Sequence, residues 1–163
     1  MPFTFYNNSI ERPQWSGDNS TIPAFMAYGS GSLQITSAGW QHVTNLNQVR
    51  INVGNHWNTT SDVFTAPFPG VYVFGYNQRL DSADVSYHRI VISYNNDTNV
   101  TTQAHSIVQG GSVGGAYHTM SISGIYNLNT GDTIRALVES ATDTNYYIHA
   151  ESQFWGHLIS TRN

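Results

Sequence analysis

The fold is decided by the stretch Phe64-Thr65-Ala66-Pro67-Phe68-Pro69-Gly70-Val71-Tyr72-Val73-Phe74. Its second half is rich in β-branched and aromatic residues, and Tyr72, Phe74 and the following Tyr76 share one face at a period of two. Proline cannot donate to a central ladder, so the two prolines predict a turn before the strand. Gly70 permits either a positive φ or a close backbone approach at the strand's first residue. The stretch therefore predicts a core strand that is entered through a tight turn.

The same period of two continues through the rest of the chain. Further strand-like segments occupy residues 87–94, 117–126, 133–138 and 146–159. Clusters of Gly, Asn, Asp and Pro separate these segments, and no window of ten or more residues carries a helical stripe. Many short strands with such punctuation predict an all-β sandwich or barrel. The 163 residues suit one domain with a substantial core.

The N-terminal segment differs from the rest of the chain. Residues 1–22 are irregular and predict an arm or a connection to a stalk, whereas residues 23–163 keep a continuous strand rhythm and predict the head domain. The first six residues, Met1 to Tyr6, lack the basic start and the apolar stretch of a secretory signal. We therefore expect the chain to reach its destination without such a signal.

The composition excludes several classes of function. The formal net charge is −4, and all six basic residues are Arg without a cluster, so we expect no nucleic-acid partner. The sequence has no apolar run of eighteen residues, and we expect no membrane insertion. The absence of Cys excludes disulfides, thiolate nucleophiles and cysteine-rich zinc sites.

The last strand-like segment indicates burial on both of its faces. Ser152, Phe154, Gly156 and Leu158 alternate with Gln153, Trp155, His157 and Ile159. The second set is nominally polar, yet it contains a Trp and an Ile. In a sandwich, apolar side chains on the outward face of a strand predict a covering subunit.

Three long segments carry a resemblance to a known family, and two shorter ones upstream, Pro23-Ala24-Phe25-Met26-Ala27 and Asn52-Val53-Gly54-Asn55-His56-Trp57, also match it. The first is the opening stretch, in which Phe64 and Pro67 precede a Gly-x-Tyr-x-Phe sequence. The second is Gly124-Ile125-Tyr126-Asn127-Leu128-Asn129-Thr130-Gly131-Asp132-Thr133-Ile134, and the third is Ser152-Gln153-Phe154-Trp155-Gly156-His157-Leu158-Ile159. In this order they resemble the globular head of complement C1q and the related tumour necrosis factors.

The resemblance implies a ten-stranded, two-sheet jelly-roll sandwich that assembles as a homotrimer. The matching family motif consists of Phe64, Pro67, Gly70, Tyr72, Phe74, Gly131 and Asp132. The resemblance also implies a subunit interface on the last strand and on the strand from 120 to 126, with the contact residues Met120, Ser121, Tyr126, Phe154 and Gly156. Independently of the family, the Gly131-Asp132 pair predicts a tight turn in which the Asp bonds its own local backbone.

No catalytic residue emerges from the sequence, and we expect a protein that is not an enzyme. It has no nucleophile elbow, phosphate loop or dinucleotide fingerprint, and its seven His have no recognised zinc spacing. The only close pair of acids on a predicted loop is Asp81 and Asp84, which are candidate ligands for calcium because that ion prefers hard oxygen donors. We expect no other cofactor.

The candidate ligand-binding residues are neutral and aromatic. They are Trp57, Asn145, Tyr146 and Tyr147, which lie on predicted loops and suit the recognition of glycans or proteins. An alternative of equal weight is that the two Tyr residues simply begin the last strand and pack.

These observations favour a trimeric recognition head on the surface of a virus particle or outside the cell. A head without Lys or Cys suits the tip of a viral or phage fibre, which assembles inside its host and binds a cell-surface glycan or protein receptor. One alternative is a secreted C1q-like lectin or signalling ligand. Another is a protein that decorates the surface of a virion or other particle.

Overall fold

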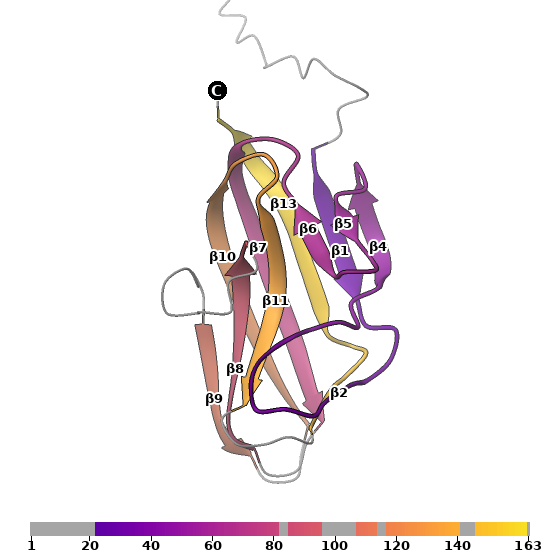
Figure 1. Ribbon diagram of the computed structural model, residues 1–163, viewed down its shortest axis with the longest axis vertical. Helices are drawn as coiled ribbons and strands as arrows, with labels where there is room; N and C mark the ends of the chain where they lie inside the picture. Colours follow the sequence, from indigo (N-terminus) through magenta and orange to yellow (C-terminus); the bar gives the residue numbers. More distant parts are fainter. Residues whose placement is uncertain (1–21, 82–84, 96–106, 114–116, 141–145, 163) are drawn as a thin grey trace, which may run out of the picture.

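The computed structural model describes residues 22–81, 85–95, 107–113, 117–140 and 146–162. The described chain forms two antiparallel sheets that pack face to face, and thirteen strands are found in this part (Figure 1). The predicted all-β, two-sheet sandwich is therefore confirmed. Among the described residues, no helix has the length and the apolar character needed to cross a membrane.

The first sheet, called sheet I below, contains the strand of the opening stretch near its centre. Five strands lie side by side in the order β4 (Gln48–Val53), β1 (Ala24–Tyr28), β13 (Gln153–Thr161), β7 (Gly70–Asp81) and β10 (His118–Leu128). Two short strands continue this sheet at the C-terminal end of β7. β12 (Tyr146–Ile148) pairs with Leu80 and Asp81 of β7, and β2 (Leu33–Ile35) pairs with β12.

The second sheet, sheet II, has the order β5 (Trp57–Asn58), β6 (Val63–Thr65), β11 (Thr133–Ser140), β8 (Val85–Tyr94) and β9 (Ile107–Val113). A short strand, β3 (Gly39–His42), pairs with the C-terminal half of β11. In the part of the chain described, the two sheets thus contain seven and six strands, thirteen in all, where ten were predicted.

The single strand predicted for residues 146–159 is corrected to two strands. β12 and β13 both pair with β7, but residues 149–152 leave the ladder between them. The backbone N–H of Ser152 donates to the carbonyl of His149, and the backbone N–H of Arg79 donates to the Ser152 hydroxyl oxygen. These hydrogen bonds stabilise a turn, after which the chain pairs with β7 again. The alternation of apolar and polar residues in the sequence continues through the turn and therefore does not reveal it.

The core between the sheets is an aromatic cluster. The ring of Phe25 stacks on Trp57 with centroids 4.6 Å apart, and it meets Phe154 edge-on at 5.3 Å. Phe64 and Phe74 meet at 5.3 Å, which joins sheet II to sheet I. Burying each such side chain contributes about 1.5–3 kcal/mol relative to its exposure. These rings therefore account for much of the packing of the two sheets.

The turn at Gly131 forms as its sequence predicts. Gly131 has a φ of 89°, in the left-handed region that favours glycine, and Asp132 accepts a hydrogen bond of 2.7 Å from the backbone N–H of Asn129. Gly70 serves a different purpose. A Cβ at this position would lie 2.5 Å from the backbone oxygen of Ser160, so the glycine allows a close approach of β7 and β13.

Candidate assembly face and ligand surfaces

The outward face of sheet I, called the assembly face below, is built from aligned rows of side chains. Directly opposite residues of an antiparallel pair point to the same face. The register places one row across all five strands: Ile51, Met26, Trp155, Gly75 and Ser123. The next row consists of Val53, Ala24, His157, Val73 and Ile125. Two neighbouring rows are thus mainly apolar on the face of sheet I that points away from sheet II.

Exposure confirms the direction of these rows. The side chain of Ile125 is 67% exposed and that of Ile51 is 47% exposed. Trp155 is half-buried because its indole lies over Gly75, where a Cβ would come within 2.2 Å of Trp155 Cζ2. The indole also stacks on the His157 ring, with centroids 6.4 Å apart. The assembly face therefore combines a fixed aromatic ring with exposed aliphatic side chains.

A hollow of about 370 Å³ lies on this face beside the indole. Met26, Ile51 and Trp155 line it, together with backbone and side-chain atoms of β1 and β13. A third row, formed by Tyr28, Gln153, Asn77 and Ser121, is polar and bounds the apolar area on the side toward β12. Apolar area with a polar border is the pattern of a protein–protein contact.

The predicted interface residues lie on the expected strands but mostly on the core face. Ser121 is exposed on the assembly face, whereas the side chains of Met120, Tyr126 and Phe154 are buried between the sheets. Tyr126 donates a hydrogen bond of 3.2 Å to the carbonyl of Ile92 in sheet II. Gly156 also faces the core, where the Phe74 ring lies against it.

The outward residues missing from that prediction are Ile125, Met26 and Ile51. Their neighbours Trp155 and His157 follow from the alternation along the last strand, which indicates a covered outward face. The positions of Met26 and Ile51 on this face depend on the pairing of β1 with β13 and β4. Strand pairing brings distant segments together, so the sequence pattern of β13 alone could not identify them.

The predicted ligand residues are divided between the core and the surface. Trp57 is 1% exposed, and its indole N–H donates to the carbonyl of Leu46 at 3.2 Å. Tyr146 is also buried and meets the ring of His88 edge-on at 5.0 Å. Tyr147 is 39% exposed, whereas Asn145 lies outside the described residues. Of the four, Tyr147 is the one whose described side chain presents an accessible surface.

The suggested calcium site stays a prediction. Asp84 and the side chain of Asp81 lie outside the part of the chain that the structure describes, although the Asp81 backbone ends β7. Among the side chains that are described, no three His, Asp or Glu gather into a group able to hold a metal ion.

Three buried polar side chains, those of Tyr76, Gln78 and His88, are joined by hydrogen bonds between the two sheets, close to β12. The Tyr76 hydroxyl donates to Gln78 Oε1 at 2.9 Å, and Gln78 Nε2 lies 2.7 Å from His88 Nε2. The Nε2 group of Gln78 can only donate, so His88 accepts at Nε2. Burial raises the pKa of Tyr76 well above its ordinary value. All three side chains are fully enclosed, so this chain of hydrogen bonds has a structural role and offers no substrate access.

Comparisons with known proteins agree with this architecture. A family model described as the C1q domain matches residues 24–159. The globular domain of the zebrafish complement 1qA protein is 17% identical, with a TM-score of 0.54 over 86% of this chain and 99% of that one. Murine APRIL, crystallised at pH 5.0, is 11% identical, with a TM-score of 0.65 over 85% of this chain and 100% of that one. At such identities these structures show the fold alone. The sequence matches none of the curated proteins.

Proposed function

Because the chain belongs to the C1q domain family, we propose that it is a non-enzymatic recognition head that assembles as a homotrimer and binds a glycan or protein on a cell surface. Domains of this jelly-roll family are generally recognition modules without catalytic activity and are typically secreted or extracellular. Fold alone does not supply a function, so the proposal depends on the surface of this chain.

The single observation that carries the proposal is the assembly face. Its apolar rows cross five strands and end at a polar row, and Ile125 and Ile51 are exposed within them. Monomeric proteins rarely expose such a continuous apolar area, because burying it against a partner is favourable. A second and a third copy of this chain are the partners that fit, since closed rings bury the same surfaces on every subunit.

We place this head at the tip of a viral or phage fibre. The support is compositional: the chain has no Cys and no Lys, and its surface polarity depends on neutral side chains. A fibre assembled inside its host needs no disulfide, and neutral amides and hydroxyls suit a glycan or protein receptor. In this proposal the protein forms part of the virion surface.

Solution mass and cell binding together test the proposal. Light scattering on the full chain should give three times 18.1 kDa, and fluorescently labelled protein should bind host cells in flow cytometry. A stable monomer would overturn the trimer. A trimer that binds particles but no cells would overturn the recognition role and favour decoration of a particle.

A further inference from the structure

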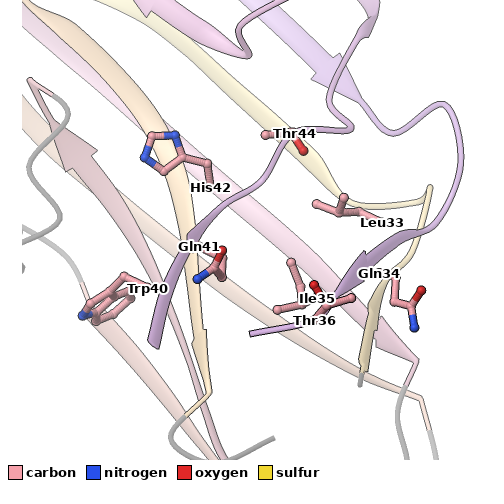
Figure 2. Close-up of a pocket in the computed structure, with 8 residues that line it drawn as sticks. All are labelled: Leu33, Gln34, Ile35, Thr36, Trp40, Gln41, His42 and Thr44. Carbon is pink, nitrogen blue, oxygen red and sulfur yellow. The ribbon is translucent and has the colours of Figure 1, made fainter. Parts of the chain in front are cut away.

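A second pocket lies between strands β2 and β3, and none of its lining residues belongs to the rows of the assembly face. Its volume is about 390 Å³, within the range of about 300–1,000 Å³ that is typical of small-molecule sites. Figure 2 shows Leu33, Gln34 and Ile35 of β2, followed by Thr36, on one side, and Trp40, Gln41 and His42 of β3 on the other. Gln41 lies between the two strands in this view, and Thr44 lies at the end of the pocket beyond His42.

The pocket exists because the chain changes sheets at this point. β2 pairs with β12 in sheet I, and β3 pairs with β11 in sheet II. In the part of the chain described, no ladder joins β2 to β3, so each strand has one edge without a strand partner. Such edges carry backbone N–H and C=O groups that a ligand can use. The two sides of the pocket are thus held by different sheets of the sandwich.

The lining of the pocket combines neutral polar side chains with the apolar side chains of Leu33, Ile35 and Trp40. Gln41 offers an amide, and Thr36 and Thr44 offer hydroxyl groups, whereas no carboxylate, Lys or Arg belongs to the lining. Gln34, Thr36 and Thr44 are exposed to solvent. An amide and a hydroxyl each donate and accept, which is the chemistry that recognises hydroxyl groups of a ligand.

His42 keeps its neutral form at this site. Burial, followed by the charge of Arg135, lowers the pKa of His42, so the ring is unprotonated at neutral pH. Arg135 has no acceptor, so its Nη1 donates to His42 Nδ1, which leaves the proton of the ring on Nε2. This hydrogen bond occupies one N–H group of the Arg135 guanidinium and holds the His42 ring in place. The pocket therefore has a positive charge behind it that disfavours cationic ligands, but no Arg in its lining that would hold an anion.

Trp40 is fixed at the opposite end of β3. Its ring packs against Val91 and Leu137 on the outward face of sheet II, and the guanidinium of Arg89 lies 5.1 Å from the ring centroid. Arg89 in turn forms an ion pair with Glu139. A wall that is already held in place loses little entropy when a ligand binds.

We propose that the pocket between β2 and β3 binds a neutral saccharide of one or two rings. The small volume, the amide of Gln41 and the hydroxyl groups of Thr36 and Thr44 match a ligand that is compact and rich in hydroxyl groups. The inference rests on the proposed recognition function, because it names the receptor chemistry that this head would read. It differs from that function in assigning the binding to particular side chains.

Saturation-transfer-difference NMR on the full-length protein tests the inference. The probes are galactose, mannose, fucose, N-acetylglucosamine and lactose, with sialyllactose as a charged comparison and a strand-forming peptide as an extended one. At least one neutral sugar should bind. Thr44→Val and Gln41→Ala should each weaken that binding roughly three- to tenfold, the effect of losing one hydrogen bond. Thr65→Val, an equally exposed change on β6 at the other end of β11, should leave it unchanged.

The possible outcomes separate the two proposals. No binding of a neutral sugar, binding of sialyllactose or the peptide alone, or binding that both pocket variants leave intact would overturn the saccharide pocket. If the double variant Thr44→Val/Gln41→Ala still binds host cells as a trimer, the recognition role survives the loss of this inference. Because Thr44 is exposed, Thr44→Val should fold normally, and an unchanged thermal melt verifies this.

Discussion

Phe74 and Gly156 face each other across β7 and β13, and the Phe74 ring occupies the space that a side chain at position 156 would need. A Cβ at Gly156 would lie 2.2 Å from Phe74 Cδ1. The adjacent pair reverses this arrangement on the outward face, where Trp155 lies over Gly75. Each of these two strands thus contributes one glycine and one large ring, and the rings lie on opposite faces of the sheet.

Gly156→Ala should destabilise the fold by roughly 1–3 kcal/mol, because the added methyl group overpacks the core against Phe74 and Phe25. Urea unfolding followed by Trp fluorescence measures the change. The matched control is Gly31→Ala, where a Cβ would meet no atom within 4 Å, and it should change stability by less than about 0.5 kcal/mol. Equal effects of the two substitutions would contradict the packing argument.

Substitutions at two neighbouring residues of β10 should affect different properties, one the assembly and the other the stability of the fold. Ile125→Glu places a charge on the assembly face and should lower the mass measured by light scattering from trimer to monomer. Tyr126→Phe removes the hydroxyl that reaches Ile92, and should cost about 1 kcal/mol of stability without changing the mass. Tyr126 is only 3% exposed, so its role in the fold is internal. A trimer that tolerates Ile125→Glu would show that this face is not the interface.

Asp62 should make the fold less stable as the pH rises. Burial raises the pKa of Asp62 from 3.8 to about 6, so the folded state holds this proton more tightly than the unfolded state. Its contribution to stability is fully present below pH 3.8 and is lost as the pH rises through 6, by roughly 2–3 kcal/mol. Asp62→Asn should remove that loss and stabilise the protein at pH 7.5. The Asn also tolerates the φ of 52° at this position.

The measurement is urea unfolding of wild type and Asp62→Asn at pH 4.5 and pH 7.5. The gain in stability from the substitution should be larger at the higher pH. A gain that is the same at both values would show that the carboxyl group does not ionise with an altered pKa.

Asp132 should show the opposite dependence on pH. Burial alone would raise the pKa of Asp132, but hydrogen bonds from Asn95, the backbone of Asn129 and Tyr94 outweigh it and lower the pKa. Its stabilisation is present above the ordinary pKa of 3.8 and is lost as the pH falls through the lowered value. Asp132→Asn should therefore cost roughly 1–3 kcal/mol at pH 7 and progressively less as the pH falls below 3.8. Thermal melts of both forms across this range check the prediction, which fails if the difference grows at low pH.

The strands that can be predicted from the sequence are those with a strong period of two. β7, β8, β10 and β11 match their predicted segments closely, because alternating large apolar side chains can be buried on one face only when the chain is extended. The short strands β2 and β3 carry no such pattern, whereas β12 lies within the predicted segment 146–159. β3 pairs with the longer strand β11 and β12 with the longer strand β7, and β2 pairs with β12.

The candidate surfaces could be predicted in part. Alternation along β13 identifies Trp155 as an outward residue that needs cover, and the tight turn at Gly131 follows from its residues. Trp57 and Tyr146 resemble surface aromatics in the sequence, but their rings close the core. The pocket between β2 and β3 has no sequence signal, since it arises where two strands that belong to different sheets lie opposite each other.

Three properties could be inferred from the sequence alone: the all-β class, the family, and the need of the last strand for cover on both of its faces. All three are encoded locally, in residue type and in a period of two along single segments. The pairing of distant segments required the three-dimensional structure. It shows that Ile51, Met26 and Trp155 form one row and that the side chain of Tyr126 points into the core. The physical reason is that strand pairing is a long-range contact between backbones, and its register is set by the packing of the whole core.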